Sequence, residues 1–231
     1  MRFPIITRWL ELLFPETCVV CNDVLRYSEK YMCTQCLSDI PQIYVHNKQH
    51  NPLEELLWGQ LLFVRATSFM VYTKKSKYAS ILHTIKYKNH QQLGIAMGEM
   101  FGAELLRSGF METIDAIVPV PLHSKRERSR GYNQSSLLAQ GISHVTDIPV
   151  IDTAVIRTKN TESQTRKNKE ERTQNVAQIF EVAQPELIQE KHILLLDDVI
   201  TTGATCLSCA ESILEQGFVS NISVASLALA R

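Results

Sequence analysis

Apolar and polar positions follow one another along the chain in a pattern typical of α/β proteins. Short apolar runs rich in β-branched residues predict strands at 61–72, 115–120, 149–156, 179–182, 192–196 and 221–230. Apolar residues recur at helical spacing and predict helices at 77–88, 93–109, 133–145 and 203–216. Because the strands are continuously apolar and alternate with helices, we expect a parallel sheet flanked by helices on both faces.

Four cysteines near the N-terminus are spaced as metal ligands. They form two C-x2-C pairs, Cys18 with Cys21 and Cys33 with Cys36, with eleven residues between the pairs. Such pairs supply four thiolates to one tetrahedral ion, and a closed shell of this kind is typical of structural zinc. Asn22, directly after the first pair, tolerates the left-handed backbone of a tight turn. The pattern predicts a small module that folds around Zn²⁺.

Two further groups of metal-ligand residue types leave alternatives open. His46 and His50 follow the second cysteine pair at a loose two-cysteine, two-histidine spacing, which would leave the first pair without a metal. Cys206 and Cys209 lie three residues apart in a predicted helix. We interpret them as buried apolar side chains, with a redox pair or a second metal site as the alternatives.

Length and composition indicate a globular protein without a membrane span. The chain has 231 residues, 45% of them hydrophobic, and its 24 basic residues balance 24 acidic ones. No apolar run approaches the roughly 20 residues of a membrane span, so we expect no stable membrane insertion. Residues 1–14 predict an amphipathic helix, interrupted by charges and therefore unlike a secretory signal. We expect this helix to dock on its own protein; reversible docking on a membrane or a partner is the alternative.

Without a secretory signal the expected compartment is the reducing cytoplasm, which disfavours disulfides. A peripheral position at the inner face of the membrane is the alternative for the amphipathic helix. We divide the chain into residues 1–60, with the helix, the zinc module and a connection, and residues 61–231, which form the main domain.

The stretch 193–205, ILLLDDVITTGAT, has the features of a sugar-phosphate site. Its apolar half predicts a central strand, with Asp197 and Asp198 at the carboxyl edge, where ligands bind in open α/β sheets. The turn that follows opens a helix whose free N–H groups suit a phosphate, and Gly203 permits close backbone approach. The two carboxylates can accept hydrogen bonds from vicinal ribose hydroxyls. A magnesium site and a plain helix cap are the alternatives.

Two basic segments supply the positive charge that a pyrophosphate needs. Residues 123–130 carry a net charge of +3 and lead into the sequence RGYNQ at 130–134. Residues 157–172 also carry +3 without apolar periodicity, so we expect a mobile loop that closes over pyrophosphate. The pyrophosphate candidates are Val120, Arg126, Arg130, Gln164, Arg166 and Arg172. Taken alone, each segment is equally typical of a solvated surface.

These motifs together resemble one family. The cysteine pairs, VPVPLH at 118–123 with RGYNQ, TESQT at 161–165 with ERTQN at 171–175, and LLLDDVITTGAT at 194–205 stand in the order found in the competence protein F (ComF) family. The resemblance implies a type I phosphoribosyltransferase-like domain behind a four-cysteine zinc module. It also implies a site for phosphoribosyl pyrophosphate (PRPP), together with Mg²⁺. On this pattern the PRPP-binding residues are Asp197, Asp198, Thr201, Thr202, Gly203, Ala204 and Thr205.

The resemblance further implies a role in natural transformation, in the handling of incoming single-stranded DNA on the cytoplasmic side. Partners of such a protein include a DNA-translocating helicase and a DNA-processing protein. Five lysines without an acid between them, interleaved with tyrosines, independently suit phosphate contacts and base stacking. They are Lys74, Lys75, Lys77, Lys86 and Lys88. A lysine-rich solvent face is the alternative for this cluster.

Three functions share this fold, and the fold does not choose among them. The first is PRPP binding with DNA handling, as the resemblance implies. The second is a metabolic phosphoribosyltransferase that transfers ribose-5-phosphate from PRPP to a nucleobase or amine. The third is a zinc-module adaptor with a vestigial sugar site. No residue stands out as a general base, so the sequence names no catalytic residue and leaves open whether transfer occurs.

Overall fold

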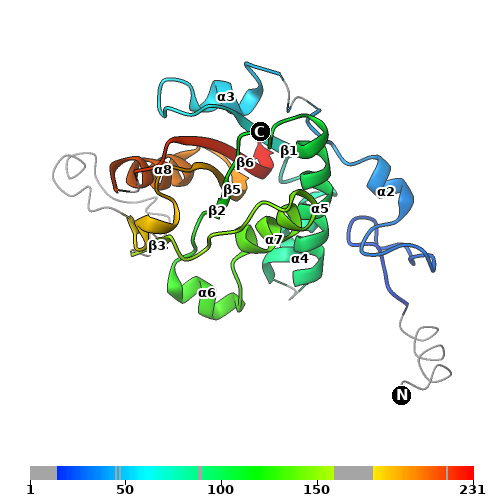
Figure 1. Ribbon diagram of the computed structural model, residues 1–231. Coiled ribbons are helices and arrows are strands. Elements are labelled where there is room, and N and C mark those ends of the chain that lie inside the picture. Colours follow the sequence, from blue (N-terminus) through cyan, green and yellow to red (C-terminus); the bar gives the residue numbers. More distant parts are fainter. Residues whose placement is uncertain (1–14, 45, 47, 88–89, 159–178, 217) are drawn as a thin grey trace, which may run out of the picture.

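The computed structural model describes residues 15–44, 46, 48–87, 90–158, 179–216 and 218–231 (Figure 1). The elements in chain order are α2 (Thr34–Ser38), α3 (Pro52–Leu57), β1 (Ala66–Tyr72), α4 (Ala79–Tyr87), α5 (Gln91–Arg107), β2 (Ala116–Pro119), α6 (Ser124–Arg130), α7 (Gln134–Thr146), β3 (Val155–Arg157), β4 (Phe180–Val182), the 3-10 helix η2 (Pro185–Leu187), β5 (His192–Ile200), α8 (Ala204–Gln216) and β6 (Asn221–Ala230). The helix expected at 1–14 lies outside the described residues, as does most of the charged loop at 157–172.

Four strands form one parallel sheet in the order β1-β6-β5-β2. The expected α/β class, with a parallel sheet flanked by helices, is thereby confirmed. β5 is a central strand, since its ladder with β6 runs from His192 to Ile200 and β2 pairs with its first half. Because all four strands run the same way, the segments that follow β1, β2 and β5 emerge at one edge of the sheet.

Neighbouring residues of β5 contribute to two separate cores, one on each face of the sheet. Leu194 and Leu196 belong to the core that contains the buried side chains of α4, α5 and α7. Ile193 and Leu195 belong to the core that contains α3, α8 and the β3–β4 hairpin. Figure 1 shows these two groups of helices on opposite sides of the sheet. Because side chains alternate between the two faces and both faces are covered, β5 is apolar without interruption from Ile193 to Leu196.

Helices α5 and α7 pack with their backbones in contact. A Cβ added at Gly98 would lie 2.3 Å from the carbonyl oxygen of Leu138, and one added at Gly141 would lie 2.1 Å from that of Ile95. Only glycine permits this approach, and α7 packs against β2 and β5 as well as against α5. The start of α7 is thereby placed beside the carboxyl half of β5.

Several elements differ from the sequence expectation. The strand expected at 61–72 begins at Ala66, and the strand expected at 149–156 is reduced to one parallel bridge, Val150 with Ile117, followed by β3. The segment 124–130 forms helix α6, which no apolar pattern predicts because none of its residues is buried. The His123 side chain caps it by accepting from Lys125 N, and Gly131 ends it with a φ of 82°.

Candidate functional site

Four cysteine sulfurs converge near the N-terminus. The Sγ atoms of Cys18, Cys21, Cys33 and Cys36 all lie within 4.8 Å of one another, and those of Cys21 and Cys33 are 3.7 Å apart. A tetrahedral ion with Zn–S bonds of about 2.3 Å needs sulfur separations of about 3.8 Å. The cluster predicted from the spacing is thus formed and fits zinc. With four protein ligands, no position remains for water or substrate, so a bound ion would be structural.

The local backbone explains how the short sequence holds these sulfurs together. Cys33 is the N-cap of α2, and its Sγ accepts from Cys36 N at 3.4 Å. Asn22 has a φ of 64°, the left-handed conformation expected for it. Burial raises the pKa of the Cys18 thiol, but hydrogen bonds from backbone N–H groups outweigh burial and bring that pKa to about 7. A thiolate, the form that binds metal, is therefore readily formed there.

The other metal-ligand residue types are used differently. His46 is buried, with its Nδ1 2.7 Å from the Thr67 hydroxyl, and His50 stacks on Trp58 with ring centroids 5.0 Å apart. The two-cysteine, two-histidine alternative is therefore not formed. Cys206 and Cys209 are buried in α8, and burial raises the pKa of both thiols. The expected burial of these two side chains is thereby confirmed.

The paired aspartates lie at a step between two strands. β2 ends at Pro119, opposite Leu196, so Asp197 and Asp198 extend beyond it along β5. The two aspartates were expected after the strand, but β5 continues to Ile200 because its pairing with β6 persists. A cavity of about 170 Å³ opens at this step, and its charged lining consists of Lys86, Arg126, Arg130, Arg157, Asp197 and Asp198.

The two carboxylates have different partners. Asp198 Oδ2 lies 2.6 Å from Lys86 Nζ. Asp197 Oδ1 accepts from the Ser135 hydroxyl at 3.2 Å and from Asp198 N at 2.8 Å. Burial and the neighbouring Asp198 carboxylate raise the pKa of Asp197 to about 7. Near neutral pH the pair therefore offers both a carboxyl proton and carboxylate oxygens, which match the acceptors and donors of a sugar diol.

The turn after β5 leads directly into α8. Gly203 has a φ of 79°, and an added Cβ would lie 3.0 Å from the Leu57 side chain. Thr201, Thr202, Ala204 and Thr205 are exposed around it, and Thr205 also lines the cavity. The turn thus presents hydroxyls and the first N–H groups of a 13-residue helix, a combination that suits a phosphate.

The RGYNQ segment links the cavity to its surroundings. Asn133 donates to the Val120 carbonyl at 3.0 Å and caps α7 by accepting from Ser135 N. The Tyr132 hydroxyl donates to the Ile85 carbonyl at 2.6 Å. These contacts hold the start of α7, the end of α4 and the segment after β2 around one space. Sequence reasoning did not single out Ser135, although it is a polar residue in the first helical turn after the motif.

The basic candidates divide into two sets. The structure places Val120, Arg126 and Arg130 on the cavity and adds Arg157, which the sequence marked only as the start of a charged loop. Burial lowers the pKa of Arg157, and the positive charge of Arg126 lowers it further, so cations are crowded here. Gln164, Arg166 and Arg172 lie outside the described residues.

The five lysines do not form one surface. Lys74, Lys75 and Lys77 are exposed after β1, at the edge of the sheet that also carries the aspartate cavity. Lys86 instead binds Asp198, and Lys88 lies outside the described residues. Lys77 Nζ is 4.0 Å from Cys36 Sγ, so it belongs to the contact between α4 and the cysteine module. DNA contact by these lysines stays a prediction.

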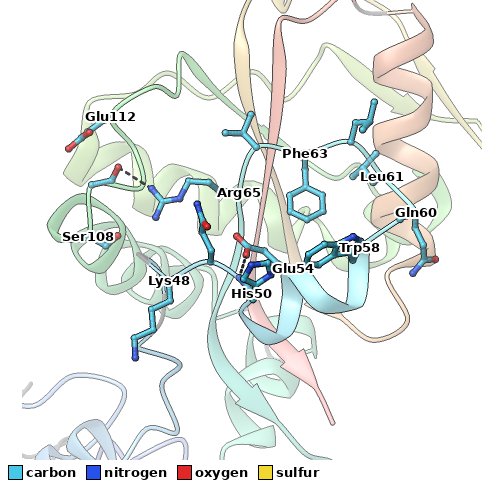
Figure 2. Close-up of a pocket in the computed structure, with 15 residues that line it drawn as sticks. Lys48, His50, Glu54, Trp58, Gln60, Leu61, Phe63, Arg65, Ser108 and Glu112 are labelled. Carbon is cyan, nitrogen blue, oxygen red and sulfur yellow. Dashed lines mark hydrogen bonds between the residues drawn. The ribbon is translucent and has the colours of Figure 1, made fainter.

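A larger cavity, of about 910 Å³, lies at the opposite edge of the sheet and is lined by residues that precede β1 and β2 (Figure 2). Figure 2 shows Trp58, Phe63 and His50 gathered on one side of it, with Arg65 on the other. Its main charged groups are bonded to the backbone: Glu54 accepts from the N–H of His50, and Arg65 donates to the carbonyls of Gly109 and His46. It contains no acidic pair beside a helix start and does not suit a sugar phosphate.

Within the described ranges, no helix is both long and apolar enough to cross a membrane. No family model matches the chain. The DNA utilization protein YhgH of Escherichia coli (strain K12) is 29% identical over 203 residues, which cover 87% of this chain and 85% of that protein.

Two competence proteins are also similar. Competence protein F of Haemophilus influenzae is 41% identical over 92 residues, 39% of this chain and 40% of that protein. Competence protein ComFC of Bacillus subtilis is 29% identical over 153 residues, 66% of this chain and 60% of that protein.

Among solved structures, a glutamine phosphoribosylpyrophosphate (PRPP) amidotransferase from B. subtilis, complexed with ADP and GMP, is similar with a TM-score of 0.41 and 18% identity. That similarity covers 58% of this chain and 26% of the longer amidotransferase chain. The chain is thus similar to YhgH over most of its length and to competence protein F and ComFC over shorter stretches, and its structure contains a four-cysteine cluster.

Proposed function

We propose that this protein binds PRPP at the step between β2 and β5 and assists the handling of incoming single-stranded DNA on the cytoplasmic side during natural transformation. The observation that carries the proposal is the cavity itself. It joins an acidic pair, four cationic side chains and the start of α8 in one space. Few small metabolites need all three features, and a ribose with a 5-phosphate and a 1-pyrophosphate does.

Each part of PRPP has a matching group in this arrangement. The carboxylate oxygens of Asp197 and Asp198 accept hydrogen bonds from the ribose hydroxyls, and a carboxyl proton of the pair can donate one to a hydroxyl oxygen. The turn at 201–205 takes the 5-phosphate through its hydroxyls and helix N–H groups. Arg126 and Arg130 line the same cavity, and we expect their charge to balance that of the pyrophosphate. Mg²⁺ entering with PRPP would neutralise further pyrophosphate charge.

The DNA part of the proposal is supported by the relatives and by the surface. The relatives bear the names DNA utilization protein and competence protein. Exposed Lys74 and Lys75 lie at the same edge of the sheet as the cavity, where a phosphate backbone can reach them. A DNA-translocating helicase and a DNA-processing protein are the partners we propose for this role.

The test is the binding of PRPP with Mg²⁺, measured by calorimetry. We expect the double variant Asp197→Asn, Asp198→Asn to lose about 10- to 100-fold in affinity, because hydrogen bonds to charged groups are removed. Asp152→Asn, at an exposed aspartate, is the control and is expected to bind as the unchanged protein does. Equal PRPP affinity in the double variant would contradict the sugar assignment.

A metabolic phosphoribosyltransferase would share this cavity and differ in turnover. Release of pyrophosphate from PRPP in the presence of a nucleobase or an amine, and absent without it, would favour that function. PRPP binding without any such release favours the proposal above. An adaptor with a vestigial sugar site would show neither binding nor release.

A further inference from the structure

A second cavity adjoins the sugar cavity and remains without a role in PRPP binding. It has a volume of about 620 Å³ and is lined by Lys86, Tyr87, Arg126, Ser129, Arg130 and Tyr132. We call it the Tyr87 groove. Lys86, Arg126 and Arg130 line both cavities, so the two spaces share a wall. Its volume lies within the range of pockets that hold small organic ligands.

The groove is held in shape by contacts that do not involve PRPP. The Tyr132 hydroxyl donates to the Ile85 carbonyl and so fixes the last turn of α4 to the segment between α6 and α7. Arg130 donates to Gln134 Oε1 at 2.7 Å. The first of these bonds joins α4 to the segment after α6, and the second joins α6 to α7.

One side of the groove is a stacking surface. Tyr87 is 64% exposed, and the Arg130 guanidinium lies 5.2 Å from the centre of its ring. The guanidinium lies over this ring and the His83 ring is tilted against it with centroids 5.0 Å apart, so the planar groups form one cluster whose exposed part can stack with an unpaired base. The rest of the lining is cationic or neutral, since no carboxylate belongs to it among the described residues.

The charge of the groove is available to a ligand. Within the described part of the chain, the Arg126 guanidinium has no hydrogen-bond or ion-pair partner of its own. It lines the groove together with Lys86 and Arg130. Burial lowers the pKa values of Arg157 and His123, and the positive charge of Arg126 lowers both further. An anionic group is therefore favoured beside Arg126.

We infer that the Tyr87 groove binds one nucleotide of a single-stranded nucleic acid, with the base stacked on Tyr87 and the phosphate beside Arg126 and Arg130. This inference rests on the proposed function, because it names the surface through which that function engages DNA. The shared wall has a further consequence. PRPP and the nucleic acid draw on the same two arginines, so each ligand weakens the binding of the other.

The test compares two tyrosines of equal exposure. Tyr87 is 64% exposed and Tyr44, far from the groove in sequence and absent from its lining, is 65% exposed. The affinity of a fluorescein-labelled oligothymidylate is measured by anisotropy at low salt for the full chain. We expect Tyr87→Ala to bind about tenfold more weakly, because base stacking is lost. Tyr44→Ala and Tyr87→Trp are expected to bind as the unchanged protein does.

Calorimetry with PRPP separates the failure of this inference from the failure of the proposed function. If the unchanged protein and Tyr87→Ala bind oligothymidylate with equal affinity, the inference that the Tyr87 groove binds nucleic acid is wrong, while the proposed function is not contradicted. An unchanged protein that binds PRPP but no oligothymidylate would overturn both the groove and the DNA part of the proposed function. Tyr87→Ala is expected to keep its PRPP affinity, which also shows that it folds. If saturating PRPP does not change the affinity for oligothymidylate, the inference that the two ligands compete at the shared wall is wrong.

Discussion

Replacing Asp197 by asparagine is expected to make the protein more stable above neutral pH, while it removes one of the two carboxylates that we propose bind the sugar. The carboxyl is partly buried beside Asp198, and Lys86 pairs with Asp198 rather than with Asp197. Burial and the Asp198 charge raise the pKa of Asp197 in the folded chain from 3.8 to about 7. Between these two pH values the folded chain holds a proton that the unfolded chain releases.

The sign and size of the effect follow from that difference. Because the folded state binds more protons than the unfolded state between about pH 4 and pH 7, the free energy of unfolding falls as the pH rises through this window. Above the folded pKa the loss is complete and amounts to at most about 4 kcal/mol for this group. Asparagine has the same shape, still accepts from Ser135 and never ionises, so it removes this pH dependence.

The assay is urea unfolding followed by circular dichroism at several pH values, with zinc present. We expect Asp197→Asn to match the unchanged protein near pH 4 and to exceed it by about 2 to 4 kcal/mol near pH 8. Asp152→Asn, at an exposed aspartate, is the control for removing a surface charge. Parallel stability curves for Asp197→Asn and the unchanged protein over this range would refute the reasoning, since they would mean that Asp197 titrates alike in both states.

Three further variants examine other parts of the structure. In the Cys33→Ser variant we expect zinc to be lost and the N-terminal module to unfold, because metal binding supplies most of that module's folding free energy. If elemental analysis still finds one zinc per chain in this variant, the prediction is wrong. Gly203→Ala is expected to cost about 1 to 3 kcal/mol in urea unfolding and to weaken PRPP binding, through its φ of 79° and the contact with Leu57. Gly59→Ala is the control for this variant, because Gly59 has a φ of 71° but no atom within 4 Å of an added Cβ. If Gly59→Ala loses as much PRPP affinity as Gly203→Ala, the turn at 201–205 has no specific role in PRPP binding. Lys74→Gln with Lys75→Gln is expected to lower oligothymidylate affinity severalfold at low salt and little at high salt; an affinity that does not change at low salt would remove these lysines from the DNA surface.

Local patterns were enough to locate the parts of the site that are contiguous in the chain. The two C-x2-C pairs predicted the sulfur cluster, because each pair lies on one short turn and two such pairs are the typical ligand set of a structural zinc ion. The run at 193–205 predicted a strand, an acidic pair and a helix start, because burial on both faces of the sheet and a glycine turn leave a direct trace in the residue types. The last strand, 221–230, has the predicted bounds for the same reason.

The partners of the charged residues could not be read in this way. Lys86 looked like one of five surface lysines, and its pairing with Asp198 arises because α4 ends beside the step between β2 and β5. The hydroxyl of Ser135 reaches Asp197 because the start of α7 packs beside β5, 62 residues away in the chain. A charged or hydroxyl side chain carries no periodic signal of what it faces. The neighbours of such a side chain are set by strand order and helix packing, which bring together residues distant in the chain. The tertiary structure therefore decided that Lys86 and Ser135 lie beside the two aspartates.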